Sequence, residues 1–131
     1  MLSDFPAFTI LLTKDLDASR RFYHEVLGIE VVREDPDRTV YRTGPGSMFV
    51  LSLSTVGTSD TQTQMAWRVP DIHAAVADLR ARGVHVEDYV APAPVTSDGV
   101  ADMGHSWAAW FLDPSNNVLA VVQPKDPPPT G

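Results

Sequence analysis

The sequence predicts an α+β protein built from two tandem βαβββ modules. A helix-like stretch occurs twice, first from Asp15 to Gly28 and again from Asp71 to Gly83. Each copy follows a short apolar run and leads into a β-branched one, so strand and helix periods alternate in the same order in both halves. A unit that occurs twice in this way indicates two similar halves arranged around a shared centre.

The first module is predicted to span residues 7–55. It begins with a short apolar strand at 8–12, followed by a helix for which Asp15 is a suitable N-cap and Gly28 a suitable C′ residue. Turns rich in Asp, Pro and Gly then separate three further strands. These strands are predicted at residues 29–33, 39–43 and 48–53.

The second module is predicted to span residues 64–123, after a polar linker at 56–63. It contains a helix capped by Asp71 and four strands. These strands are predicted at residues 64–69, 84–88, 107–112 and 117–122. The second half also carries a longer connection at 89–104, which we interpret either as a loop that covers a cavity or as a neutral surface excursion. The proline-rich tail, 124–131, is predicted to be disordered.

The composition excludes several classes of function. The chain has 131 residues, 44% of them apolar, which suits one soluble domain over residues 1–123. It has no cysteine, so thiolate chemistry and disulfides are excluded. The formal charge of −7 disfavours nucleic acid as a partner. No apolar run is long enough to span a membrane, and the N-terminus does not resemble a secretory signal, so a cytoplasmic location is expected.

Several motifs together resemble the vicinal oxygen chelate superfamily. They are the stretch from Asp15 to Gly28, the Gly83-Val84 step after the second helix, and the Phe-x-Asp-Pro-x-x-Asn hairpin at 111–117. This superfamily includes glyoxalase I, extradiol dioxygenases and bleomycin-resistance proteins. The resemblance implies a mixed sheet that curls around a cavity, with the helices on the outside. It also implies a homodimer, because such proteins often dimerise or exchange modules.

The same resemblance implies four positions for metal ligands. The first-strand ligand of each module lies seven residues before the helix-starting aspartate, which gives Phe8 and Gln64. The last-strand carboxylate positions are occupied by Ala120 and by Val50 or Ser52. Only glutamine among these is a plausible metal ligand, and a divalent metal needs several nitrogen or oxygen ligands. We therefore expect no metal cofactor, although an atypical site built from Gln64 and His105 is left open.

Strand alternation predicts which side chains face the cavity instead. Apolar side chains dominate this set, with a few polar ones, as is usual for a small-molecule pocket. The candidate ligand-binding residues are Phe8, Ile10, Met48, Val50, Ser52, Gln64, Arg68, His105, Trp107 and Ala120. Trp107 and Trp110 should point to opposite faces, one into the core and the other toward a ligand. Arg68 requires an anionic partner, either Glu87 or Asp88 or a group on the ligand.

Three functions are compatible with these residues, so whether the protein is an enzyme is left open. The leading hypothesis is a metal-free protein that binds a small, partly apolar organic molecule, such as an antibiotic or a metabolite, in the cavity between the modules. The second is a metal-dependent lyase, isomerase or dioxygenase with an atypical metal site. The third is a domain that acts mainly by association.

Overall fold

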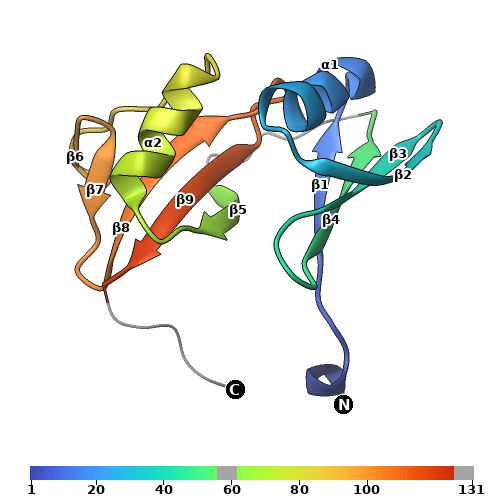
Figure 1. Cartoon of the computed structure of the whole chain (residues 1–131), viewed down its shortest axis with the longest axis horizontal. Coiled ribbons are helices and arrows are strands. Elements are labelled where there is room, and N and C mark those ends of the chain that lie inside the picture. The colour runs from blue at the N-terminus through green and yellow to red at the C-terminus, as the bar shows by residue number, and fades with distance from the viewer. Residues whose placement is uncertain (56–61, 126–131) are drawn as a thin grey trace. The chain divides into compact units, whose positions relative to one another are not determined.

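The chain forms two units, each with its own sheet and helical segments. The computed structural model describes residues 1–55 and 62–125 (Figure 1). The first unit comprises Met1–Asp60 together with Pro114–Asn117, and the second comprises Thr61–Asp113 together with Val118–Gly131. The predicted α+β class is confirmed, with a mixed sheet in each half of the chain.

The first unit contains a four-stranded sheet in the order β1-β4-β3-β2. Strand β1 runs parallel to β4, and the other neighbouring pairs are antiparallel. The elements of this unit are η1 (Leu2–Asp4), β1 (Thr9–Thr13), α1 (Leu16–Arg20), η2 (Arg21–Val26), β2 (Glu30–Asp35), β3 (Arg38–Arg42) and β4 (Met48–Leu53). All four strands lie within about two residues of their predicted positions.

The first helix begins as predicted but changes type in its second half. The Asp15 carboxylate accepts a hydrogen bond from the Ala18 amide, as an N-cap side chain does. From Arg21 the helix continues as the π-helix η2, in which the Leu27 amide donates to the Phe22 carbonyl five residues earlier. Apolar spacing indicates the buried face of a helix but does not distinguish an α turn from a π turn, so the sequence did not predict this change.

Aromatic rings fill the space between this helix and one face of the sheet. Tyr23 comes from η2, while Tyr41 and Phe49 come from β3 and β4, and all three side chains are fully buried. The Tyr41 and Phe49 rings stack with their centroids 5.0 Å apart, and Tyr23 lies 5.5 Å from Phe49. Because neighbouring strand residues point to opposite faces, this core occupies only one face of the sheet.

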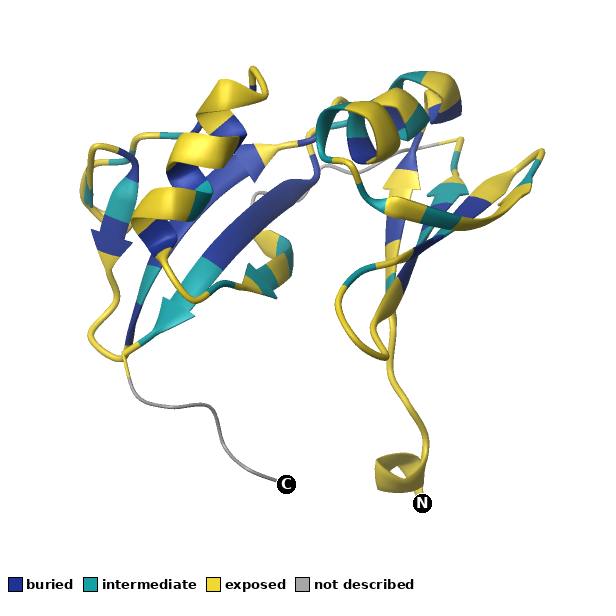
Figure 2. Ribbon diagram, in the orientation of Figure 1, coloured by how far each residue is buried: buried dark blue, intermediate teal, exposed yellow. Residues whose placement is uncertain are grey.

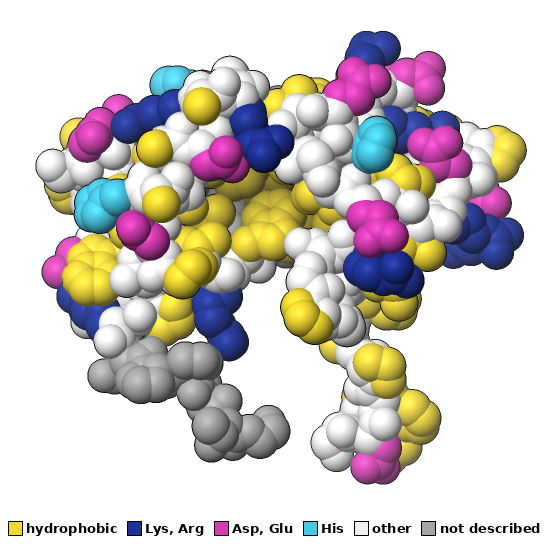
Figure 3. Space-filling view, viewed as in Figure 1, with side chains coloured by type: hydrophobic (Ala, Val, Ile, Leu, Met, Phe, Trp, Pro, Cys, Tyr) yellow, Lys and Arg dark blue, Asp and Glu magenta, His cyan; other side chains and the backbone are white. Residues whose placement is uncertain are grey.

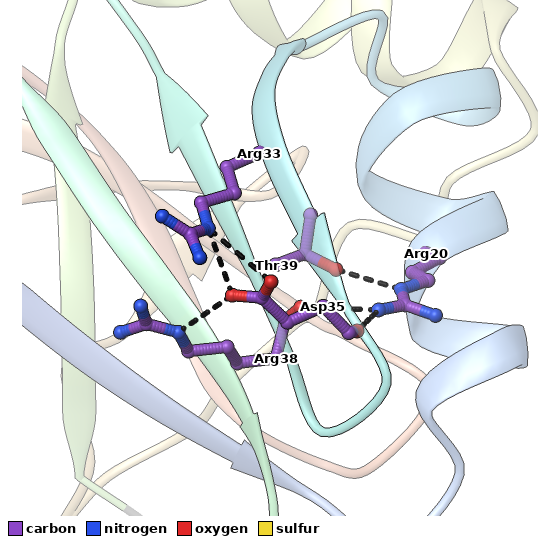
Figure 4. Close-up of polar contacts among 5 residues, drawn as sticks. All are labelled: Arg20, Arg33, Asp35, Arg38 and Thr39. Atoms are coloured by element: carbon purple, nitrogen blue, oxygen red, sulfur yellow. Dashed lines mark hydrogen bonds and ion pairs between the residues drawn. The ribbon is translucent and has the colours of Figure 1, made fainter.

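Arg20 fastens the helix to the β2–β3 hairpin (Figure 4). Its Nε donates to the Thr39 hydroxyl at 2.7 Å. Its Nη2 donates to the Arg38 carbonyl at 3.0 Å and to the Asp35 carbonyl. One guanidinium therefore satisfies backbone acceptors of the turn and a hydroxyl in the core, a use for which its planar set of donors is well suited.

The turn between β8 and β9 belongs to the first unit rather than the second. The Ser115 hydroxyl is hydrogen-bonded to the Thr13 hydroxyl at 2.6 Å, and the Asn117 side-chain amide donates to the Leu12 carbonyl at 2.9 Å. Both contacts lie at the end of β1. The Asp-Pro-x-x-Asn turn of the predicted hairpin therefore contributes polar groups that complete the first unit.

The second unit contains a five-stranded sheet in the order β5-β9-β8-β7-β6. Strand β5 is parallel to β9, and the other pairs are antiparallel. The elements of this unit are β5 (Thr63–Arg68), α2 (Ile72–Ala81), β6 (Thr96–Ser97), β7 (Val100–Asp102), β8 (Ser106–Leu112) and β9 (Val118–Pro124).

Helix α2 covers one face of this sheet. The Asp71 carboxylate caps its first turn by accepting from the His73 and Ala74 amides, as predicted. The Gln123 side chain, on β9, accepts from the Ile72 amide at 2.8 Å and so identifies the face of β9 that the helix covers. Figure 2 shows that most of β8 and β9 is buried, whereas the outer side of α2 is exposed.

The structure differs from the prediction along the segment after α2. No strand is formed at 84–88, where the Glu87 amide donates to the Trp110 carbonyl at 2.8 Å but no ladder continues. Farther along the same edge, β7 pairs with β8 at Trp107 and Ala108, and both β7 and β6 lie inside the predicted loop at 89–104. The strand-like pattern at 84–88 therefore did not indicate that the strand pairing on this edge is made by a later segment.

The boundaries of the linker and the tail also differ. Thr63 belongs to β5 rather than to the predicted linker at 56–63, and Pro124 belongs to β9 rather than to the tail at 124–131. Lys125 is placed as well, since its ammonium group donates to the Asp102 carboxylate. The remaining parts of these two predictions, 56–61 and 126–131, lie outside the described residues.

Candidate functional site

One face of the first unit's sheet is not covered by any helix in the described residues of that unit, and we call it the helix-free face. Its residues follow from the strand register, because paired residues point to the same side. Ile10 lies opposite Val50, which lies opposite Val40, and Leu12 lies in the same way beside Ser52 and Arg38. The helix-free face comprises Ile10, Leu12, Met48, Val50, Ser52 and Val40, followed by Arg33, Arg38, Arg42, Glu30 and Asp35. Phe8 directly precedes β1, and we assign it to this face because alternation along the chain continues from Ile10.

Large apolar side chains on this face are exposed. Phe8 is 62% exposed, Ile10 57%, Met48 48% and Leu12 37%. Single exposed apolar residues are ordinary on a protein surface, but four that share one sheet face form a patch, and such patches mark binding surfaces. Figure 3 shows hydrophobic side chains at the surface of this unit beside dark-blue Lys and Arg side chains.

The face changes from apolar to cationic across its strands. Its β1 positions are apolar, whereas its β2 and β3 positions include three arginines and two carboxylates. Asp35 accepts from Arg33 Nε at 3.0 Å and from Arg38 Nε at 3.1 Å, and its carboxylate lies between them in Figure 4. Arg42 Nη1 lies 3.3 Å from the Glu30 carboxylate.

The arginines also affect the titration of Asp35. The hydrogen bond from Arg38, followed by the hydrogen bond and the charge of Arg33, holds the pKa of Asp35 below its ordinary value despite an opposing effect of desolvation. The Asp35 carboxylate therefore stays ionised at neutral pH. The charges of three guanidinium groups on this face are thus partly balanced by two carboxylates.

The second unit also has a sheet face opposite its helix, but the centre of that face is filled. Trp110, Ala108, Ala120 and Val118 form a buried cluster, in which Ala120 is 1% exposed. Tyr89 packs against this cluster with its ring 5.6 Å from Trp110, in an edge-to-face arrangement. Ala120, a predicted ligand-binding residue, is thus enclosed by its neighbours rather than exposed on a surface.

The two tryptophans of β8 point to opposite faces, as predicted. Trp107 is paired with Gln123 on the face that α2 covers, and the Lys125 ammonium lies 4.7 Å from its ring. Trp110 is paired with Ala120 on the other face, where its indole Nε1 donates to the Thr63 hydroxyl at 3.0 Å. Trp110, rather than the predicted Trp107, therefore lies on the same sheet face as Ala120, the face predicted to line a cavity. Strand alternation predicts that the two rings lie on opposite faces, but it does not indicate which ring lies on the face covered by α2.

The residues of the predicted metal positions do not fit a metal ion. The Gln64 carbonyl oxygen accepts from the Val118 amide at 2.8 Å, beside a β-bulge that shifts the register between Thr63 and Met65. Phe8 and Ala120 carry no side-chain nitrogen or oxygen. His105 is exposed between β7 and β8. Within residues 1–55 and 62–125, no three His, Asp or Glu side chains are grouped as a metal site requires.

Arg68 does not form the ion pair predicted for it. Its side chain is exposed, and the described residues offer it neither an ion pair nor a hydrogen bond. Glu87 lies 3.9 Å from His85, and the Asp88 carboxylate accepts from the Thr96 hydroxyl and the Gly99 amide. Both predicted partners are therefore engaged elsewhere in the second unit.

Comparison with known proteins agrees with this architecture. A putative glyoxalase family protein from Bacillus anthracis matches 92% of this chain and 95% of its own, with 15% identity and a TM-score of 0.71. A glyoxalase/bleomycin resistance protein/dioxygenase from Alicyclobacillus acidocaldarius matches 94% and 93%, with 22% identity and a TM-score of 0.68. TnmS3, an antibiotic binding protein from a Streptomyces species, matches 90% and 93%, with 22% identity and a TM-score of 0.68.

These likenesses concern the fold, and no curated protein matches the sequence. None of the helices in the described part of the chain is both long and apolar enough to cross a membrane. The family model of the Glyoxalase/Bleomycin resistance protein/Dioxygenase superfamily matches residues 6–121, which is nearly the whole chain. The chain therefore belongs to the glyoxalase/bleomycin resistance protein/dioxygenase superfamily.

Proposed function

We propose that this protein binds a small, partly apolar organic molecule without a metal ion, and that the helix-free face of the first unit supplies the apolar contacts. The observation that carries the proposal is the exposure of Phe8, Ile10, Leu12 and Met48 on one sheet face. Complete burial of such a side chain contributes about 1.5–3 kcal/mol, and these side chains are roughly half exposed. A ligand that covers two of them therefore gains about that amount in total.

The residue types at the family's metal positions support the metal-free part of this proposal. The side chains of Phe8 and Ala120 have no metal-binding atom, and the oxygen of Gln64 is occupied by the Val118 amide. Lewis-acid chemistry in this superfamily depends on nitrogen and oxygen ligands at these positions. An antibiotic binding protein of similar fold, TnmS3, illustrates that this architecture serves for binding small molecules.

A titration with a neutral apolar dye, N-phenyl-1-naphthylamine, tests the proposal. The wild-type protein is expected to bind the dye saturably, with one site per chain, and Ile10→Thr is expected to weaken binding. Val95→Thr is the matched control, because Val95 is 62% exposed, close to the 57% of Ile10, but lies in the second unit. Both variants retain a β-branched side chain. Equal effects of the two substitutions, or the absence of saturable binding, would contradict the proposal.

A homodimer and a cytoplasmic location complete this proposal. The apolar side chains of Leu2 and Phe5 at the N-terminus are 77% and 63% exposed, and they offer additional surface for a second copy of the chain. Light scattering after size-exclusion chromatography should give the mass of two chains. A mass of 14.3 kDa, that of one chain, would remove the dimer from the proposal.

A further inference from the structure

We infer that the ligand of the helix-free face is an organic anion, with an apolar body over β1 and β4 and a carboxylate or sulfonate group that binds either Arg38 or Arg42. This inference rests on the proposed function and specifies the chemical class of its ligand. It follows from the order of side chains across the sheet, from the donors that the arginines leave unused, and from the local balance of charge.

The order of side chains places cationic groups directly beside apolar ones. The register runs from Leu12 through Ser52 to Arg38 in one row across the strands. A second row brings Arg42 beside Met48 on the same face. Neighbouring residues of a sheet have Cβ atoms about 4.5–5.5 Å apart, so a small molecule is long enough to contact both an apolar and a cationic position.

The arginines of this face retain unused donors. Arg38 engages Asp35 through Nε alone, and Arg42 engages Glu30 through Nη1 alone. Within the described residues, the two terminal amino groups of Arg38 have no hydrogen-bond partner. These two groups form the planar fork that binds a carboxylate or a sulfonate through two parallel hydrogen bonds.

The balance of charge on this face is opposite to that of the whole protein. The chain carries a formal charge of −7, yet the helix-free face has three arginines against the carboxylates of Glu30 and Asp35. One positive charge therefore remains on this face. An anionic group placed there is attracted locally, whereas a cationic ligand would have to approach two or more guanidinium groups.

The second unit, taken by itself, also carries an exposed arginine on the sheet face opposite its helix. Arg68 lies opposite Val122 on the face away from α2, with an exposed side chain and no ion pair among the described residues. Apart from the two carboxylates already named, the register places no acidic residue among the strand positions of the first unit's helix-free face.

A pair of dyes that differ in a single group provides the test. The probe 8-anilinonaphthalene-1-sulfonate carries one sulfonate, and N-phenyl-1-naphthylamine has the same rings without it. We expect the wild-type protein to bind the sulfonate about tenfold more tightly, the ratio that about 1.4 kcal/mol produces. Because charge attraction between accessible groups is screened by salt, this preference should shrink as the ionic strength rises.

Substitutions then assign the preference to the arginines. The double variant Arg38→Gln/Arg42→Gln should bind the two dyes with about equal affinity. Arg38→Lys/Arg42→Lys keeps the charge but not the planar fork, so it should retain part of the preference. Arg82→Gln is the matched control, because Arg82 is an ion-paired, exposed arginine on the other unit. Melting temperatures of all variants show whether they remain folded, and the lysine variant keeps the test informative if the glutamine variant unfolds.

The outcomes separate the two proposals. If the neutral dye binds but the sulfonate gains nothing, or if the preference survives in the double glutamine variant, the anion inference is wrong and the proposed function stands. If neither dye binds saturably, the proposed function itself fails, and the inference fails with it.

Discussion

Replacing Arg20 by alanine should destabilise the protein through the loss of the contact between α1 and the β2–β3 hairpin. The largest part of the loss comes from the 2.7 Å hydrogen bond to Thr39, whose side chain is fully buried. A hydrogen bond from a charged donor contributes about 1.5–3 kcal/mol. The bond to the Arg38 carbonyl is exposed and the bond to the Asp35 carbonyl is part-buried. Because water can replace the guanidinium at these backbone oxygens, the two bonds add about 0.5–1 kcal/mol together. The expected loss is about 3 kcal/mol.

Urea unfolding followed by far-UV circular dichroism measures this loss as a change in the free energy of unfolding, because helix and sheet of both units contribute to the signal. In a separate thermal unfolding experiment, a loss of about 3 kcal/mol corresponds, for a chain of this size, to a decrease in melting temperature of about 10 °C. Arg82→Ala is the control, because the Arg82–Asp78 ion pair is an exposed pair one helical turn apart and should contribute less than about 1 kcal/mol. If Arg20→Ala lowers the free energy of unfolding no more than Arg82→Ala does, the hydrogen bonds of Arg20 do not contribute as described.

Two further predictions concern buried and crowded positions. Burial raises the pKa of Tyr41 to about 12, so above pH 10 the unfolded chain loses this proton before the folded one does, and stability falls. Between pH 8 and pH 11, the free energy of unfolding should fall by about 1.4 kcal/mol less in Tyr41→Phe than in the wild type. Equal falls in the two proteins would show that Tyr41 does not have the raised pKa. Gly99→Ala should cost about 2–4 kcal/mol, because its φ is +82° and a new Cβ would lie 2.7 Å from a methyl carbon of Val86. Gly104 has a φ of +88°, and a Cβ added there would have no atom within 4 Å, so Gly104→Ala should lose only the stability that the strained backbone costs. If thermal unfolding shows equal losses of stability for Gly99→Ala and Gly104→Ala, the steric clash at Gly99 is excluded.

The duplicated helix motif explains why the fold class could be predicted from the sequence. Asp15 and Asp71 cap helices in the structure as expected, because a short carboxylate at an N-cap satisfies exposed amides whatever the tertiary context. Strand β4, Met48–Leu53, was predicted with its observed bounds, since a Gly-Pro-Gly turn precedes it and a polar segment follows it. Local chemistry was sufficient for these elements.

Elements that depend on competition between segments could not be predicted. Residues 84–88 have a strand-like pattern, but within the described residues they make only one backbone hydrogen bond to β8, at Trp110, and β7 forms the ladder farther along the same edge. Which segment extends a ladder is decided by the folded sheet. The register of Gln64 depends on a bulge that no local pattern reveals. Alternation likewise separated Trp107 from Trp110 without indicating which of them α2 would cover.

The candidate site was partly predictable for the same reason. The apolar positions Phe8, Ile10 and Met48 share a face because the side-chain period of a strand is two. The arginines of β2 and β3 were missed, although the alternation of Arg38, Val40 and Arg42 along one strand was a usable signal. That these arginines lie on the same face as the apolar positions depended on the pairing of β3 with β4, which the sequence pattern does not give.

Binding of an apolar organic molecule without a metal ion is the property on which both proposals depend. The most direct measurement is a titration of N-phenyl-1-naphthylamine into protein dialysed against EDTA, repeated after addition of Mn, Fe, Ni or Zn, with the metal content determined in parallel. We predict saturable binding by the dialysed protein, an unchanged dissociation constant after each metal is added, and a metal content far below one ion per chain. A stoichiometric metal that survives dialysis, or dye binding that appears only once a metal is restored, would contradict the account.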